Sequence, residues 1–285
     1  MRSMWSGLWV MSLAFVWAMW CCRAAEPVDV LLISQDYVIL EQGKGGAQAK
    51  DVRQNIYITR DFLCIDDMGG KQGNLVVDET IMVDLKNRQI INLDHKNKRK
   101  VVESFEDRRK RLETIKRSNQ GDIDALSPGP QRTKVENLWR AMLDDSRKFQ
   151  LDSTGEKELA GVKCKSVKIS DSKQPDYVPF EASLHPDLEM PYDNTEVLFL
   201  LKIIGKHLAD FLRENKELFK KVPMELHIDL AAGGRLDCKV VDVKRTTSDK
   251  LDLTARGALG SPFEVPANYT EAAKAIPQDS HKEKP

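Results

Sequence analysis

The chemically active residue types in this chain do not have the spacing of a known active site. No HExxH, GxSxG, Walker or calcium-loop pattern occurs in the sequence. Gly43-Lys44-Gly45-Gly46 lacks the Ser or Thr that follows Lys in a phosphate-binding loop, so it indicates a hairpin tip. Ser170-Asp171-Ser172-Lys173 has the S-x-x-K spacing without the partner motifs of that enzyme class. We therefore expect a protein that is not an enzyme and that uses no cofactor.

The histidines and cysteines add little as ligands or nucleophiles. Cys64, Cys164 and Cys238 follow residue 25, and an odd number in an exported chain permits one disulfide at most. Cys164 and Cys238 are the pair expected to be closest, either bridged or buried as thiols on a shared face. A Cys–His nucleophile pair that uses one of them is the catalytic alternative. No two histidines have the i,i+4 spacing of a metal site; they are His95, His185, His207, His227 and His281.

The first third of the chain after the leader is predicted to form strands. Strands are expected at Val30–Leu40, 54–58 and 62–65, where Leu, Ile, Val and aromatic residues are frequent. A hairpin with the three-residue loop Lys86-Asn87-Arg88 is predicted next, with Asn87 in the left-handed region. An odd-numbered loop would place all the odd-numbered apolar residues around it on one face, namely Ile81, Val83, Leu85, Ile91 and Leu93.

Two helical regions are predicted. The first is an excursion over 104–146, with a polar helix from Ser104 to Arg117 and a short helix from Lys134 to Asp145. The second is a long helix over 195–221, because Asp193 and Glu196 have the spacing of a capping box and Pro223 disfavours continuation.

Strands are expected to resume after the long helix. Met224 to Leu230 and Leu236 to Val240 alternate between apolar and polar residues. A five-residue loop between them would place Ile228 opposite Cys238 and on the same face. Many strands joined locally, without βαβ alternation, indicate an α+β protein with an antiparallel sheet and helices on one side. We expect one domain over 26–274 and a tail without core residues at 275–285.

Residues Met1 to Ala25 have the composition of a secretory signal peptide. Arg2 precedes an apolar run, and Ala24 and Ala25 are small residues suited to cleavage. We expect a periplasmic or secreted protein with no membrane span after cleavage, because the apolar run is shorter than a bilayer-spanning helix. Beyond residue 25 the chain has 42 basic and 44 acidic side chains, which argues against a nucleic-acid partner. The basic residues from Lys96 to Arg117 have acidic residues interspersed and are interpreted as a solvated face, the alternative being a patch for acidic lipid head groups or an acidic partner.

Two segments resemble exported bacterial proteins of the LolA/LolB/LppX group. Thr154 to Ile169 is similar to a "tG…k.I.Gy.C..y.v" strand of that group, although Val162 stands where an aromatic residue is frequent. Pro262 to Tyr269 is similar to a closing "lF.iPagY" element. The group comprises lipoprotein and lipid carriers. The resemblance implies an unclosed antiparallel half-barrel, with helices covering its concave apolar face, and it transfers no individual functional residue.

Three functions remain open at this point. The first is a non-enzymatic carrier or sensor that shelters a lipid, an acyl chain or another apolar ligand between sheet and helices. The second is an envelope interaction module with a solid core that binds a protein partner, and the third is a secreted hydrolase. The residues predicted to line a ligand site are apolar and assigned to inner faces: Val83, Ile91, Leu93, Trp139, Val197, Leu201, Ile204, Leu208, Phe211, Leu226 and Ile228.

Overall fold

The structure is a computed structural model that describes ten stretches of the chain. They are residues 27–43, 46–69, 75–125, 127–129, 132, 148–172, 178–192, 194–201, 206–229 and 235–272. The expected signal peptide, the short helix at 134–145 and the tail at 275–285 lie outside these residues. Within the described residues, none of the helices has the length and apolar character needed to cross a bilayer.

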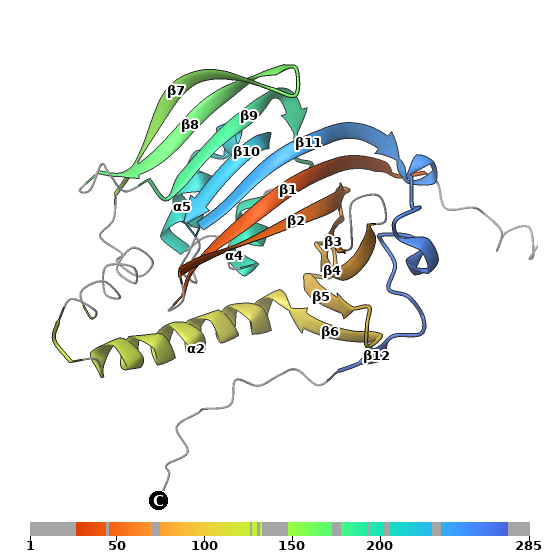
Figure 1. The fold of residues 1–285 in the computed structure, drawn as a ribbon, viewed down its shortest axis with the longest axis horizontal. Helices are drawn as coiled ribbons and strands as arrows, with labels where there is room; N and C mark the ends of the chain where they lie inside the picture. The colour runs from red at the N-terminus through yellow and green to blue at the C-terminus, as the bar shows by residue number, and fades with distance from the viewer. Residues whose placement is uncertain are drawn as a thin grey trace, which may run out of the picture.

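One curved sheet of twelve strands forms the body of the molecule (Figure 1). Its order is β12-β6-β5-β4-β3-β2-β1-β11-β10-β9-β8-β7, so β12 and β7 form the two edges and the sheet does not close into a barrel. The pairing is antiparallel except for that of β12 with β6. The predicted α+β half-barrel is therefore confirmed. The strands are β1 (Asp29–Gly43), β2 (Gly46–Ile58), β3 (Phe62–Gly69), β4 (Val76–Asp84), β5 (Gln89–Asp94), β6 (Arg99–Ser104), β7 (Phe149–Leu159), β8 (Val162–Asp171), β9 (Phe180–Glu189), β10 (Lys221–Asp229), β11 (Arg235–Thr247) and β12 (Thr270–Glu271).

The helices differ in number from the prediction. α2 (Phe105–Asp124) begins where Ser104 Oγ accepts a hydrogen bond from the backbone N–H of Asp107 at 3.0 Å, which caps the helix. The long helix predicted over 195–221 is instead three helices: α4 (Asn194–Leu200), α5 (Lys206–Glu214) and α6 (Lys216–Phe219). The helical region ends at Phe219, since Lys221 already belongs to β10.

Pleating of the sheet divides its side chains between two faces. On the concave face, α4 packs against Leu31, Ile33, Ile58 and Leu63, and α5 packs against the strands of the β7 half. Figure 1 shows α4 and α5 inside the curve of the sheet. The two clusters on this face contain Val197 and Leu200 of α4, and Leu208, Ala209 and Leu212 of α5.

The convex face is covered by the end of the described chain. Residues 251–272, called here the C-terminal strap, run past β3, β4 and β5 to β12 (Figure 1). Leu251, Phe263, Val265 and Tyr269 of the strap pack against a convex cluster. The sheet contributes Val30, Leu32, Tyr57, Cys64, Met82, Ile91 and Leu93 to that cluster.

A buried ion pair joins the strap to the convex face. Arg256 donates from Nη1 to both carboxylate oxygens of Asp66, and both side chains are 0 % exposed. Thr80 Oγ1 donates to Asp66 Oδ1 at 2.6 Å and lies 2.8 Å from His95 Nε2. His95 Nδ1 is 2.5 Å from the hydroxyl of Tyr269. A continuous hydrogen-bond chain therefore leads from the sheet back to the strap.

The predicted register of the β4–β5 hairpin is wrong. The loop has four residues, 85–88, and Val83 pairs with Ile90 while Met82 pairs with Ile91. Arg88, rather than Asn87, has a positive φ, of 54°. Because an even-numbered loop reverses the parity, Ile91 and Leu93 lie in the convex cluster and Ile90 joins Val83 on the concave face.

The β10–β11 and β7–β8 hairpins agree better with what the sequence predicts. β10 and β11 pair Leu226 with Cys238 and Ile228 with Leu236, so Cys238 and Ile228 share a face as predicted, although the register differs by two residues. β7 and β8 are joined by Ala160 and Gly161, both with positive φ, which is the geometry of a type I′ turn. Thr154 to Ile169, the first of the two segments that resemble the carrier group, therefore forms most of this hairpin.

Candidate ligand cavity

A cavity of about 460 Å³ lies between the concave face and the helices. Its size falls within the roughly 300–1,000 Å³ of small-molecule sites. Side chains from β1 to β4 form its floor, α4 supplies part of its cover, and β9, β10 and β11 form a further wall. The cavity therefore lies where the sequence placed a ligand, between sheet and helices.

Isoleucines from four neighbouring strands form the apolar floor. Ile33 pairs with Ile56, Ile56 with Ile65, and Ile65 with Ile81, so the four side chains lie in one row across β1, β2, β3 and β4. All four line the cavity, and each is packed against the concave core. We call them the isoleucine row. β-Branched side chains suit this position because they are stiff and pack well on a pleated surface.

A polar row lies next to the isoleucine row on the same three strands. Gln35, Gln54 and Asp67 are cross-strand partners, and each lies two residues from an isoleucine on its own strand. Gln35 Nε2 donates to Gln54 Oε1 at 2.8 Å, and Gln54 Nε2 donates to Asp67 Oδ1 at 2.6 Å. Tyr37 donates its hydroxyl to Asp67 Oδ2 at 3.4 Å. Burial, then the neighbouring Asp67 carboxylate, raises the pKa of Tyr37, so its hydroxyl remains a donor.

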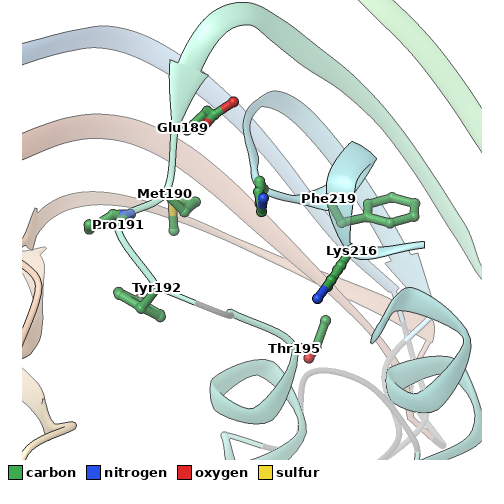
Figure 2. A pocket seen from close by; sticks show the side chains of 8 residues that line it. Glu189, Met190, Pro191, Tyr192, Thr195, Lys216 and Phe219 are labelled. Atoms are coloured by element: carbon green, nitrogen blue, oxygen red, sulfur yellow. The ribbon is translucent and has the colours of Figure 1, made fainter. Parts of the chain in front are cut away.

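A second, smaller pocket of about 270 Å³ adjoins the cavity. The two share Met190, Tyr192 and Phe219 as lining residues. Figure 2 shows the smaller pocket, in which Lys216 extends from α6 towards Thr195 of α4. The three shared side chains lie between the cavity and the charged residues of the smaller pocket, among them Glu189 and Lys216.

Polar contacts from α2 and from the β4–β5 loop hold α4 in place over the cavity. Glu196 of α4 forms ion pairs with Arg109 and, at 3.0 Å, with Arg88. Arg108 donates from Nε to the backbone carbonyl of Leu200 at 2.8 Å, at the negative end of α4. Arg108 and Arg111 both also bind the buried carboxylate of Glu103, at 3.2 and 2.6 Å. Part of the basic stretch read as a solvated face therefore positions the cavity cover.

The structure brings only some of the predicted ligand residues to the cavity. Val197, Leu201 and Leu226 line it. Val83, Leu208 and Ile228 are buried in the concave core, and Phe211 packs against that core beside Phe149, with ring centroids 5.6 Å apart. Ile91 and Leu93 lie on the convex side. Trp139 and Ile204 are outside the described residues.

Sequence reasoning missed the floor of the cavity. The isoleucine row and the polar row come from strands that were predicted, but their alignment depends on the registers of three separate hairpins. A signal was present, since a polar residue stands two positions from an apolar one at 33/35, 54/56 and 65/67. Period-two alternation places the members of each pair on one face.

The cysteines and histidines do not form the catalytic pair that was considered. Cys64, Cys164 and Cys238 are free buried thiols. β9 and β10 lie between the strands of Cys164 and Cys238, so these strands are not neighbours. Burial raises the pKa of Cys238 to about 12, which keeps it protonated and unreactive at neutral pH. His227 binds Asp237 at 2.5 Å and alternates with Leu226 and Ile228, so it faces away from Cys238.

Metal binding has no candidate within the part of the chain that the structure describes. No group of three or more His, Cys, Asp or Glu side chains there is arranged to hold an ion. The polar groups that line the cavity are two amides, two phenols, one carboxylate and the ammonium of Lys221. They are suited to hydrogen bonding.

Comparison with known proteins gives similarity in structure only. No known family model matches the chain, and no curated protein matches it. An uncharacterized conserved protein from Thermus thermophilus is similar with a TM-score of 0.38 and 9 % identity, over 85 % of this chain and 89 % of that one. A putative outer membrane lipoprotein-sorting protein domain from Vibrio parahaemolyticus has a TM-score of 0.30 and 7 % identity, over 78 % and 87 %. A LolA superfamily protein from Nitrosomonas europaea has a TM-score of 0.28 and 8 % identity, over 76 % and 86 %.

Two of these proteins carry names from the group that the two sequence segments resemble. At TM-scores this low the likeness carries no argument about a ligand or a role. The function must therefore be argued from the cavity itself.

Proposed function

We propose that this protein is an exported, non-enzymatic carrier or sensor that shelters a lipid, an acyl chain or another apolar ligand between its sheet and helices. The observation that carries the proposal is the 460 Å³ cavity floored by the isoleucine row. Export is proposed from the composition of Met1 to Ala25.

The placement of the apolar residues supports a ligand site over a solid core. Ile56, Ile65 and Ile81 of the isoleucine row line the cavity and are only partly buried, as is Leu201, whereas Leu208 and Leu212 of α5 are buried. Apolar surface left around a cavity of this size gains free energy when an apolar ligand covers it, by about 25 cal/mol for each Å² removed from water. The alternative, an interaction module, was expected to have a solid core, and this cavity does not fit that expectation.

The direct test is whether an apolar ligand copurifies with the protein. Native mass spectrometry of the protein recovered from the exporting host, before and after lipid extraction, is expected to show a mass that extraction removes. N-terminal sequencing of the same sample should begin near Ala25. A chain that still begins at Met1 would contradict export, and a single mass in both samples would favour the interaction module.

A cavity-filling variant tests the location of the ligand. Ile56→Trp adds volume in the middle of the isoleucine row and is expected to reduce binding of a neutral fluorescent alkyl probe about tenfold or more, since the indole occupies the space the probe needs. Val241→Trp is the control, because Val241 is on β11 and 48 % exposed. Equal binding by both variants would place the probe elsewhere. Binding of the neutral probe should hardly depend on salt, because apolar burial is not screened.

A further inference from the structure

The polar row gives the cavity a chemical preference, on the premise that the proposed function holds. We propose that Gln35, Gln54 and Asp67 select amphiphiles whose head group donates hydrogen bonds, a primary ammonium most strongly and a hydroxyl less so, and that they reject carboxylate heads. The hydrocarbon chain of such a ligand would lie along the isoleucine row.

The hydrogen bonds of the row all run in one direction. A carboxylate can only accept, so Gln54 must present its amide N–H to Asp67, 2.6 Å away. The carbonyl of Gln54 must then accept from Gln35 Nε2, at 2.8 Å, which orients the second amide as well. Tyr37 donates to the other oxygen of Asp67. The row therefore ends in an acceptor, Asp67, and begins with the free carbonyl oxygen of Gln35.

Unused acceptor capacity remains at the row. A carboxylate offers about four lone-pair sites, and the described contacts of Asp67 use two of them, those with Gln54 and Tyr37. Polar groups in an otherwise apolar pocket orient the ligand, and a site built for a donor rejects an analogue that lacks it. A hydroxyl or an ammonium satisfies the remaining acceptors, and a carboxylate does not.

The charged side chains that the structure describes at this end of the cavity are acidic. Within the described residues Asp67 forms no ion pair, and Glu79 of β4 is its cross-strand partner. No basic side chain from the described part of β1 to β4 lines the cavity. A cationic head would be attracted to this region, and a carboxylate head would be repelled.

The lysines near the smaller pocket attract a carboxylate head group only weakly, because two of them are paired with glutamates. Lys221, which lines the cavity, is paired with Glu189 at 2.8 Å, and Lys220 is paired with Glu217 at 2.8 Å. Glu189 also lines the smaller pocket beside Lys216. The acidic and basic groups there largely offset one another, whereas the carboxylate of Asp67 is not offset.

The geometry also suits a head group attached to a chain. Each member of the polar row lies two residues from an isoleucine on the same strand, which is about 6–7 Å. A head group that contacts Asp67 therefore has its first methylenes over the isoleucine row. No movement of the sheet is needed for the two contacts to form together.

The test is a comparison of three ligands that differ only in their head group. Dodecylamine, dodecanol and dodecanoate would each displace a neutral fluorescent alkyl probe from the purified full protein at neutral pH. We expect the amine to compete at a concentration at least about tenfold lower than dodecanoate, a difference of about 1.4 kcal/mol, with the alcohol between them. Equal competition by all three, or the strongest competition by dodecanoate, would overturn the inference and leave the proposed function intact.

A matched pair of variants assigns the preference to the row. Asp67→Asn is expected to reduce the ratio between amine and carboxylate to within about threefold. Asp36→Asn, which removes a charge from the exposed pair with Arg53 at 2.8 Å, should leave the ratio unchanged. An unchanged ratio in Asp67→Asn would overturn the inference.

Salt dependence tests the same point without a variant. A direct contact with Asp67 inside the cavity is screened much less than a contact between exposed charges, so the wild-type preference for the amine over dodecanoate should persist in about 0.5 M salt, where the Debye length is about 4 Å. A preference that disappears in salt would place the amine on exposed carboxylates and overturn the inference. Failure of the probe to bind at all would instead refute the proposed function, on which this inference rests.

Discussion

The two faces of the sheet are organised in opposite ways. The concave face keeps an open cavity with partly exposed isoleucines and a polar row whose hydrogen bonds leave acceptors available. The convex face is closed by the C-terminal strap, and its polar groups are buried and bonded to one another. Polar residues on a sheet can therefore either bind a ligand or hold another segment of the protein against the sheet. They are available to a ligand only where their hydrogen-bonding groups are not already paired within the protein.

The contrast between the two faces predicts which substitutions destabilise the fold. A residue of the convex network supports the fold directly, because a buried charge that loses its partner is costly. A residue of the cavity wall already faces open space, so its removal changes binding more than stability. Substitutions on the convex face should therefore lower stability, and substitutions in the cavity wall should mainly weaken binding.

The largest effect is expected from Arg256→Met. This change leaves the carboxylate of Asp66 buried without its cation, and the free energy of unfolding should fall by about 3–5 kcal/mol. Arg53→Met is the matched control, since the exposed Arg53–Asp36 pair contributes only about 0–1 kcal/mol. Denaturant unfolding measures both.

The double variant Asp66→Leu with Arg256→Met sharpens the test. Replacing both charges removes the unpaired carboxylate and should recover most of the loss. Similar losses for Arg256→Met and Arg53→Met would mean that the strap does not depend on the buried pair, and the contrast between the two faces would fail.

The next largest effect separates two leucines that the sequence assigned to one helix face. Leu208→Ala removes a side chain buried between α5 and the sheet, and should cost about 2–5 kcal/mol. Leu201→Ala removes a side chain that lines the cavity, and should cost about 1 kcal/mol or less while weakening binding of an alkyl probe. Thermal unfolding measures the loss of stability in both variants, and titration with the alkyl probe measures the loss of binding. Equal destabilisation would mean that the cavity wall is part of the solid core.

These leucines illustrate how far the sequence determines the fold. Apolar periodicity correctly predicted that apolar residues of α4 and α5 cover the sheet, because an amphipathic face must be buried. It did not predict that Leu201 borders a cavity while Leu208 lies in the core, since both have the same spacing and hydrophobicity. That difference depends on which strands each helix faces.

The β4–β5 hairpin shows the same limit at the level of register. Parity fixes the face of every residue in a strand, and one residue of loop length reverses it. A local signal for the true loop was present: Asp84 accepts hydrogen bonds from the backbone and side chain of Asn87, at 2.8 and 2.7 Å. Asp94 and Asn97 repeat that arrangement in the next turn, at 2.9 and 2.7 Å. The shared D-x-K-N spacing would have indicated two equal four-residue loops and placed Ile91 and Leu93 correctly.

A smaller effect is expected from loosening the cover of the cavity. Glu196→Gln weakens the ion pairs that hold α4 to Arg109 of α2 and to Arg88 of the β4–β5 loop, and it should accelerate dissociation of a bound alkyl probe about two- to fivefold. Stopped-flow dissociation is the measurement. Glu217→Gln, which affects only a pair on α6, is the control and should leave the rate unchanged. An unaltered rate in Glu196→Gln would show that ligand exchange does not involve movement of α4.

The smallest effect tests the convex face through pH. Thr80 donates to Asp66, so its oxygen accepts from His95 Nε2–H, and Nδ1 is left to accept from the hydroxyl of Tyr269. In this arrangement of hydrogen bonds the imidazole is neutral. Burial lowers the pKa of His95, and the nearby Arg256 adds to this effect while Asp66 opposes it.

The sign of the pH dependence follows from this shift. The pKa of His95 is lower in the folded protein than the value of about 6.5 in the unfolded chain, so below pH 6.5 the unfolded chain binds more protons. His95 therefore contributes stability that is present above about pH 6.5 and is lost as the pH falls through its folded pKa. Melting temperatures at pH 7.5 and pH 5 are expected to differ more in the wild type than in His95→Gln. His185 also has a pKa lowered by burial, so His185→Gln provides the reference for a histidine that is not part of the hydrogen-bond chain to the strap. If His95→Gln keeps the full pH dependence of the wild type, protonation of this relay does not govern closure of the convex face.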